Sequence, residues 1–174
     1  MRDKCILPFL ITERLEFFQL TQADLPELEI LLGDTEIMYA WEHGFTKIES
    51  QAWLNENLRR YSSDGYSYWA VRKKNDGSLI GVMGILKEVA EGKQYIGIGY
   101  ILNKKYWGQG YAGEGTEALC QYAFRKLQLQ TLTAQVRTNN FASQHIAEGL
   151  GMKAMCNFCL LYTSPSPRDL STSR

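Results

Sequence analysis

A turn rich in glycine and aromatic residues is the segment of this sequence best suited to chemistry. It reads Tyr-Trp-Gly-Gln-Gly-Tyr-Ala over residues 106–112. The β-branched and aromatic run 95–102 before it predicts a strand, and apolar residues at helical spacing after it predict a helix that begins near Ala112. Glycines let a backbone approach a ligand, and the first N–H groups of a helix have no partner within it. Because the helix dipole also favours negative charge, we expect this turn to bind a phosphate or pyrophosphate.

We tested the same residues against two glycine patterns that bind nucleotides, the dinucleotide fingerprint and the phosphate loop. Gly108-x-Gly110-x-x-Gly113 matches the letters of the dinucleotide fingerprint. That fingerprint requires an immediate strand-to-helix turn and an acidic residue about 20 positions further on. Here residues 103–107 intervene, and the stretch 128–140 contains neither Asp nor Glu. The phosphate-loop pattern fails as well, because no Lys-Ser/Thr pair follows the last glycine. A nicotinamide dinucleotide oxidoreductase is therefore an alternative supported by the fingerprint letters alone.

The segment 107–112 resembles motif A of the Gcn5-related N-acetyltransferases, the GNAT family, in which Gln/Arg-x-x-Gly-x-Gly/Ala follows a strand. Trp107 departs from the usual Gln or Arg, as it commonly does in the branch that acetylates ribosomal-protein N-termini. The run Thr-Glu-Arg-Leu at 12–15, followed by a helix start at Thr21-x-x-Asp24, is similar to that branch too. The resemblance covers about residues 11–158. It implies a GNAT fold, acetyl-CoA as co-substrate, and transfer to a primary amine on a small molecule or a protein N-terminus.

The resemblance also implies where acetyl-CoA binds. Backbone amides of the turn would hold the pyrophosphate, and amides of the preceding strand would face the thioester. The implied cofactor-binding residues are Tyr100, Ile101, Leu102, Trp107, Gly108, Gln109, Gly110, Tyr111, Ala112 and, at the start of the last helix, Asn140.

Acetyl transfer needs a neutral amine, donors for the developing oxyanion and a proton for the departing thiolate. Many GNAT relatives supply that proton from a tyrosine seven residues after the asparagine, but this position is Ala147 here. In the ribosomal-protein branch, a serine at the position of Ser143 is proposed to stabilise the thiolate. The alternative is that Asn140 and Ser143 only cap the helix, a position that both residue types favour.

The general base has no obvious counterpart in this sequence. Relatives often carry Glu-Ile-Gly-Tyr on the central strand, whereas this chain has Gly97 in place of the glutamate. Glu42 and His43, in an aromatic-rich loop, are the candidates for the base; the alternative is a plain surface pair. A peptide α-amine, with a pKa near 7.7–8.0, is about a tenth neutral at pH 7, while a lysine amine is far less so. The missing glutamate therefore favours an α-amine as acceptor.

Composition limits the other classes of function. The 174 residues suit one domain, and 19 basic residues balance 19 acidic ones. The net charge therefore gives no reason to expect nucleic acid or an anionic membrane as partner. The four cysteines show no reliable paired spacing typical of zinc, so we expect no metal and a reduced, cytoplasmic protein. No apolar run is long enough to span a bilayer. The sequence does not indicate an oligomeric state.

The predicted elements follow the order strand, two helices, hairpin, strand, helix, strand, helix. This order suits an α/β domain with a mixed sheet, in which the strand after the crossover helix runs parallel to the central strand. It does not suit a doubly wound parallel fold, because the hairpin precedes the phosphate turn. Beside the central strand, the predicted strands are 11–20, 66–72, 78–87 and 131–137, and the predicted helices begin near Thr21, Thr46, Ala112 and Asn140.

The end of the chain differs from the rest. The run from Cys159 to Asp169 resembles, over its whole length, one reading frame of a common transposase sequencing adapter. We therefore expect an acetyltransferase domain over 1–158 and a non-native or disordered tail over 159–174, with a natural Ser/Pro-rich tail as the alternative. The GNAT family closes its sheet with two more strands, and only 152–158 remain to form the first. The sequence thus predicts a fold that lacks its last strand and keeps an exposed edge.

A non-catalytic acyl-CoA-binding module is the other alternative, favoured by the missing strand glutamate and helix tyrosine. For an enzyme, we expect direct transfer in a ternary complex, because no cysteine lies in a recognisable nucleophile setting.

Overall fold

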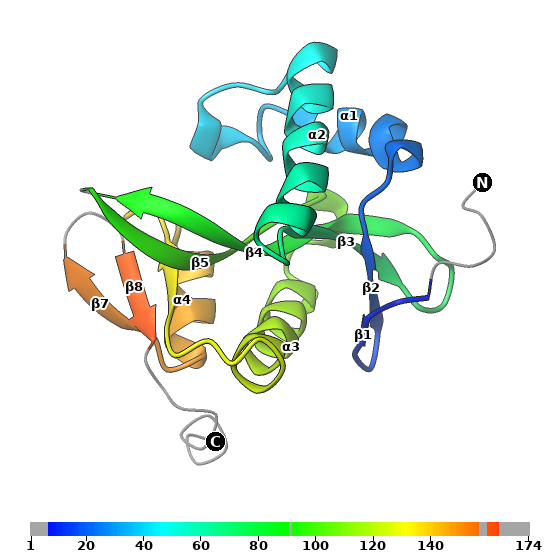
Figure 1. Ribbon diagram of the computed structural model, residues 1–174. Coiled ribbons are helices and arrows are strands. Elements are labelled where there is room, and N and C mark those ends of the chain that lie inside the picture. Colours follow the sequence, from blue (N-terminus) through cyan, green and yellow to red (C-terminus); the bar gives the residue numbers. More distant parts are fainter. Residues whose placement is uncertain (1–6, 91, 157–159, 164–174) are drawn as a thin grey trace. The chain divides into compact units, whose positions relative to one another are not determined.

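A computed structural model of the chain describes residues 7–90, 92–156 and 160–163, and Figure 1 shows its elements. They form two units. The first contains the described residues up to Gly84 together with Tyr100–Tyr111, and the second contains Ile85–Gly99 and the described residues from Ala112 onward. The boundary falls inside β4 (Leu79–Ala90) and β5 (Lys93–Leu102), so each of these strands contributes to both units.

The first unit opens with a tight hairpin where the sequence predicts one strand. β1 (Leu10–Ile11) and β2 (Leu15–Gln19) pair in antiparallel register. Thr12 reverses the chain: its N–H donates to the Leu15 carbonyl at 2.9 Å, and its hydroxyl accepts from the Leu15 N–H at 3.0 Å. The turn contains no Gly, Pro, Asn or Asp, so the usual turn signals are missing and the sequence predicts an unbroken strand. The reversal places Arg14 on the exposed end of the hairpin.

Both capping patterns in this unit are confirmed. The Thr21 N–H donates to Asp24 Oδ2 at 2.8 Å. The Glu49 N–H donates to Thr46 Oγ1 at 3.2 Å, and the Thr46 N–H donates to Glu49 Oε2 at 2.7 Å. Such reciprocal bonds satisfy N–H groups that a helix start leaves without partners. The elements that follow are the 3-10 turn η1 (Gln22–Asp24), α1 (Leu25–Gly33) and α2 (Lys47–Ser63).

The strands of the first unit form an antiparallel arrangement. β3 (Tyr68–Lys73) pairs with β2 on one side and with β4 on the other. The predicted hairpin turn between β3 and β4 contains Gly77, whose φ of +71° is left-handed. Burial of apolar side chains from helices and strands gives the unit its core. Its fully buried members include Leu15, Phe17, Leu28, Leu32, Leu54, Val71 and Ile80.

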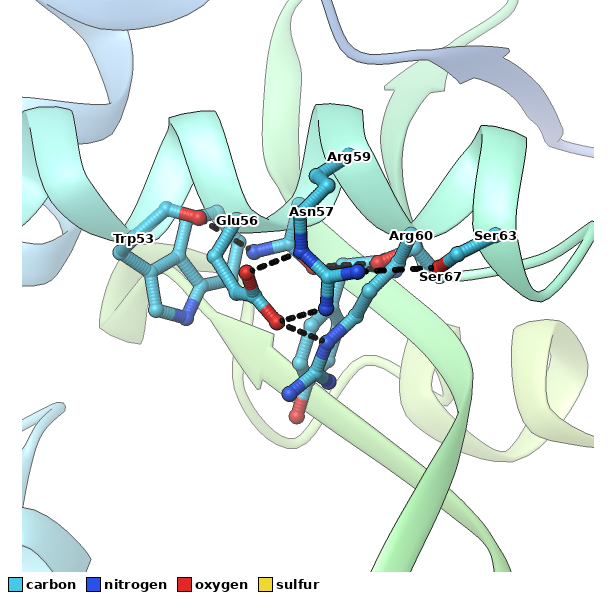
Figure 2. A network of polar contacts seen from close by, with 8 residues as sticks. Trp53, Glu56, Asn57, Arg59, Arg60, Ser63 and Ser67 are labelled. Atoms are coloured by element: carbon cyan, nitrogen blue, oxygen red, sulfur yellow. Dashed lines mark hydrogen bonds and ion pairs between the residues drawn. The ribbon is translucent and has the colours of Figure 1, made fainter.

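A buried polar network connects α2 to the start of β3, as Figure 2 shows. Asn57 is 3% exposed; its amide donates to the Trp53 carbonyl at 2.7 Å, and its carbonyl accepts from the Ser67 hydroxyl at 2.5 Å. On the outer side of the helix, Glu56 accepts hydrogen bonds from Arg59 and Arg60, and these bonds lower the pKa of Glu56 to about 2. The bond from Ser67 connects the helix to the start of the strand, whereas the bond to Trp53 lies within the helix and the outer bonds are partly exposed to solvent.

The second unit contains the parallel part of the sheet. β5 pairs in parallel with β6 at Gly97 and Thr133, as predicted, so the intervening helix is a crossover. Its helices and the strand between them are α3 (Tyr111–Arg125, whose first residue belongs to the first unit), β6 (Leu132–Gln135) and α4 (Phe141–Gly149). Within the described ranges, no helix has the length and apolar character of a membrane span.

The end of the sheet differs from the expectation of an unfinished fold. β7 (Lys153–Cys156) is followed by β8 (Leu160–Thr163), which lies between β6 and β7 and pairs antiparallel with both. The strand order is β1-β2-β3-β4-β5-β6-β8-β7, a mixed sheet in an α/β protein, so the predicted fold class is confirmed. The Leu-Leu-Tyr-Thr run is rich in residues that favour strands, which explains why a segment expected to be tail can pair here. Its origin stays a prediction, and residues 164–174 lie outside the described ones.

The network around Asn57 predicts a stability effect. Asn57→Ala leaves the buried Ser67 hydroxyl without its acceptor, so we expect the free energy of unfolding to fall by about 1–3 kcal/mol. Asn55→Ala, on the exposed face of the same helix, is the matched control and should change it by less than about 0.5 kcal/mol. Urea denaturation measures both variants. Equal effects at the two positions would contradict a structural role for the buried amide.

Candidate active site

The glycine turn joins β5 to α3 and lies at the surface. After the short 3-10 turn η3 (Lys104–Tyr106), Gly108 has a φ of +70° and Gly110 a φ of +80°. Both values are left-handed, a conformation that glycine adopts at little cost. Residues 107–110 are exposed, so a ligand can reach the turn from solvent.

The helix start after the turn is suited to negative charge. α3 begins at Tyr111, one residue from the predicted start, and carries Glu114 in its first turn. The Thr116 hydroxyl donates to the Ala112 carbonyl at 2.6 Å. The first N–H groups of a helix lack partners within it, and together with the helix dipole they form an anion site. The geometry predicted for a phosphate turn is therefore present.

The Trp107 side chain anchors the turn to the strand before it. Its indole N–H donates to the Leu102 carbonyl at 2.9 Å, while the ring remains 46% exposed. The residue that departs from the family pattern therefore has a structural role of its own. It closes the segment between strand and helix by binding the last carbonyl of β5.

Arg14 braces the turn from the β1–β2 hairpin. Its Nη1 donates to the Gln109 carbonyl at 2.9 Å, and its guanidinium lies 4.3 Å from the centre of the Tyr111 ring. A side-chain carbon at Gly110 would lie 3.3 Å from Nη2 of Arg14, so glycine at this position also makes room for the brace. Sequence reasoning missed this residue. The sequence feature that could have indicated Arg14 is its position in the Thr-Glu-Arg-Leu run of residues 12–15.

Lys104, which precedes the turn, forms ion pairs with two carboxylates of the protein. Its ammonium lies 2.8 Å from a Glu36 carboxylate oxygen and 3.2 Å from one of Asp34. The hydrogen bond to Glu36, followed by the one to Asp34, raises the pKa of Lys104. Because these carboxylates neutralise its charge, Lys104 contributes little to the binding of an anion at the turn, where backbone N–H groups and the helix dipole are available.

Tyr100, Ile101 and Leu102 form the end of β5. Ile101 and Leu102 are 3% and 5% exposed, so their side chains belong to the core and only their backbones can serve a ligand. The β5–β6 pairing matches Gly97 with Thr133, and β6 ends two residues later. In a parallel pair, the residues that follow a matched pair are matched in turn, so the last residue of β6 lies beside Gly99. The three residues of β5 after Gly99 therefore extend beyond the end of β6. A role of these three residues at the thioester stays a prediction.

His43 lies in the loop between α1 and α2 with an acceptor at each ring nitrogen. Nδ1 is 3.1 Å from the Trp41 carbonyl, and Nε2 is 3.1 Å from Glu49 Oε1. A carbonyl and a carboxylate can only accept, so a ring that bonds to both carries two protons. The hydrogen bond to Glu49, followed by the one to Trp41, raises the pKa of His43. In this arrangement the ring has no lone pair for a proton, so His43 must release one partner before it can act as a base.

Glu42 has an uncommon backbone conformation. Its φ is +70°, and its N–H donates to the Tyr39 carbonyl at 3.2 Å to close the 3-10 turn η2 (Tyr39–Trp41). Left-handed backbone is uncommon for a residue with a side chain and occurs often at functional loops. The Trp41 and Phe45 rings of this loop meet edge to face, 6.4 Å apart. A role for Glu42 as base stays a prediction.

Asn140 and Ser143 lie in the second unit, at the start of α4. Asn140 is the cap residue, and its side-chain oxygen accepts from the Ser143 N–H at 3.1 Å. Helix capping therefore accounts for the asparagine. The Ser143 side chain is half-buried, and its role toward a thiolate stays a prediction. In the described part of the chain, no three His, Cys, Asp or Glu side chains gather as metal ligands would.

Known proteins share the sequence pattern of this chain. A family model described as acetyltransferase (GNAT) domain matches residues 14–153. The chain is similar to Uncharacterized protein YkkB of Bacillus subtilis (strain 168), with 30% identity over 144 residues. That alignment covers 82% of this chain and 84% of the relative.

Solved structures share its fold. An acetyltransferase from Agrobacterium tumefaciens str. C58 matches with a TM-score of 0.75 and 24% identity, over 90% of this chain and 92% of that one. The ribosomal L7/L12 alpha-N-protein acetyltransferase RimL, in complex with coenzyme A, matches with a TM-score of 0.72 and 18% identity, over 93% and 99%. Because both sequence identities are below 25%, these similarities establish a shared fold and not a shared substrate.

The brace predicts a local effect of changing Arg14. Arg14→Lys keeps the charge but loses the planar fork that bonds Gln109 and stacks on Tyr111. We expect the backbone of residues 108–110 to become more mobile on the ps–ns timescale, because the turn loses the hydrogen bond to Gln109 and the stacking on Tyr111. NMR order parameters of these residues measure this, with Arg59→Lys on the exposed face of α2 as control. Unchanged order parameters in Arg14→Lys would show that the contact does not hold the turn.

The contacts of His43 predict its titration. Because a raised folded-state pKa means that the imidazolium is the stabilised form, the His43–Glu49 contact stabilises the loop below the ordinary pKa of 6.5 and is lost as pH rises through the folded value. Glu49→Gln should lower the pKa of His43, measured by NMR titration. Glu42→Gln should lower the pKa of His43 less, since the charge of Glu42 makes the smallest contribution to raising this pKa. An unchanged pKa in Glu49→Gln would contradict the pairing.

Proposed function

Because the chain belongs to the acetyltransferase (GNAT) family, we propose that it is an acetyl-CoA-dependent N-acetyltransferase that acts on primary amines. The observation that carries the proposal is the exposed turn 107–110, braced by Arg14 and followed directly by a helix start. An exposed backbone with two left-handed glycines and a helix N-terminus suits a pyrophosphate. The coenzyme A bound in the RimL structure supports the use of an acyl-CoA here.

We propose direct transfer in a complex that holds both substrates. Cys120, the cysteine whose side chain is described, is 1% exposed, and burial raises the pKa of its thiol to about 12. Such a thiol forms almost no thiolate near neutral pH and does not suit an acyl-enzyme intermediate.

We also propose that the protein is located in the cytoplasm.

The acceptor in this proposal is an amine with a low pKa, a protein or peptide N-terminus above all. An α-amine is partly neutral at pH 7, so it places a smaller demand on a base than a lysine does. Tyr39 and Trp41, 38% and 41% exposed, belong to the loop that we expect to select the acceptor together with α2. The nucleophile attacks the thioester while backbone N–H groups at the end of β5 would stabilise the oxyanion.

Calorimetric titration with acetyl-CoA tests the binding half of the proposal. We expect micromolar binding and no binding of NADH, which carries a pyrophosphate but belongs to the alternative dinucleotide function. A panel of short peptides with free α-amines, with release of the CoA thiol as readout, tests turnover. Binding without turnover on any amine would favour a non-catalytic acyl-CoA module. A folded chain that ignores acetyl-CoA would contradict the proposal altogether.

A matched pair of glycine variants locates the binding site. Gly108 and Gly77 have φ values of +70° and +71°, and a side-chain carbon would meet nothing within 4 Å at either position. Alanine therefore imposes the same backbone strain, about 1–2 kcal/mol, at both. We expect Gly108→Ala to weaken acetyl-CoA binding about tenfold and Gly77→Ala to leave it unchanged. Equal affinities for the two variants would move the pyrophosphate away from the turn.

A further inference from the structure

Lys104 connects the loop between α1 and α2 to the segment that follows β5. It is the first residue of η3, two residues after β5 ends at Leu102. Its ammonium lies 2.8 Å from Glu36 Oε2 and 3.2 Å from Asp34 Oδ2, both at the start of loop 34–45. All of these residues belong to the first unit. The ion pairs therefore hold the start of this loop near the end of the central strand.

Asp34 also shapes the loop that Lys104 binds. Its Oδ1 accepts from the Glu36 N–H at 2.9 Å and from the Ile37 N–H at 3.2 Å. Its carbonyl accepts from the Met38 N–H at 2.9 Å. Ile37 and Met38 are buried, so the first residues of the loop are anchored in the core. One carboxyl group thus fixes the backbone of the loop and binds the lysine of η3.

The two ends of the loop lie together. The Phe45 N–H donates to the Leu32 carbonyl at 2.7 Å, and a side-chain carbon at Gly44 would collide with the Gly33 carbonyl. Loops whose ends are close form compact units that pack on their own side chains. Here the rings of Trp41 and Phe45 meet edge to face. A contact at the start of such a loop therefore also influences where its exposed aromatic side chains lie.

We propose that Lys104 is a positioning residue for the amine acceptor, an inference that rests on the proposed function. In that function, the thioester lies at the end of β5, and the loop with the exposed Tyr39 and Trp41 contacts the acceptor. Lys104 directly follows the end of this strand and binds the loop. It therefore fixes the acceptor side of the site relative to the thioester side. Placing two reactants correctly is a large part of catalysis.

The same contacts separate Lys104 from the other role that a lysine beside a glycine turn could have. Such a lysine can bind a phosphate, but the charge of Lys104 is offset by two carboxylates of the protein. The adjacent Lys105 differs. Its ammonium lies 4.8 Å from the centre of the Tyr106 ring, and it forms no ion pair with the residues that the structure describes. The two neighbouring lysines therefore provide a matched comparison.

Lys104→Gln removes the ion pairs and keeps a polar side chain. At pH 7, we expect the KM for an α-amine peptide to rise about three- to fivefold, the upper range for an exposed ion pair. The kcat and the acetyl-CoA Kd should stay within about twofold of the wild type, because the variant loses binding of the acceptor alone. Lys104→Arg keeps a cation between the two carboxylates and should restore KM. Lys105→Gln removes the same charge from the same 3-10 turn and should leave the peptide KM unchanged.

A second variant distinguishes positioning from a general effect of charge. The peptide is mostly an ammonium at pH 7. Electrostatic attraction alone would therefore lower its KM in Lys104→Gln and raise it in Glu36→Gln. Positioning predicts a rise in both variants, smaller in Glu36→Gln because Asp34 still binds Lys104. In the double variant the two effects should not multiply, because both remove one contact.

Three results in an active enzyme would overturn the inference. They are a wild-type peptide KM in Lys104→Gln, changes of opposite sign in Lys104→Gln and Glu36→Gln, and a weaker acetyl-CoA Kd in place of a raised peptide KM. The last result would make Lys104 a phosphate ligand. A wild-type chain that binds acetyl-CoA but acetylates no amine would overturn the proposed function, and this inference with it.

Discussion

The contact between Arg14 and the glycine turn is the constraint on which the proposed site most depends. Two glycines allow the turn to adopt left-handed backbone, but glycine also gives a loop many other conformations. The hydrogen bond to the Gln109 carbonyl and the stacking on Tyr111 select one of them. The Trp107 indole fixes the other side by bonding to the last carbonyl of β5. Preorganisation of this kind lowers the entropy cost of binding an anion with backbone groups.

The central strand β5 has two functions that compete for its residues. Its end supplies buried side chains to the core, so chemistry there falls to the backbone. Its middle contains Gly97, where a residue with a side chain would collide with Glu88. The neighbouring strand β4 therefore places an acidic side chain beside the middle of β5.

Local patterns in the sequence predicted much of this fold. The capping pair at Thr46 and Glu49, the glycine turn and the parallel pairing of β5 with β6 depend on residues close in sequence or on connection rules, and each is confirmed. The contacts of Arg14 and Glu88 join residues 95 and 47 positions apart, so no local pattern could predict them. The hairpin at Thr12 was missed because its turn contains none of the residues Gly, Pro, Asn or Asp that usually mark a turn. The strand Leu160–Thr163 was missed because an expected origin outside the protein took precedence over its strand propensity.

The central claim is that the turn after β5 binds the pyrophosphate of acetyl-CoA through its backbone. Titrating an isotope-labelled chain with acetyl-CoA and following the amide resonances by NMR tests it most directly. The account predicts that the largest shifts fall on residues 108–112, that desulfo-CoA produces them too, and that NADH does not. Shifts confined to other parts of the chain, or equal shifts with NADH, would contradict it.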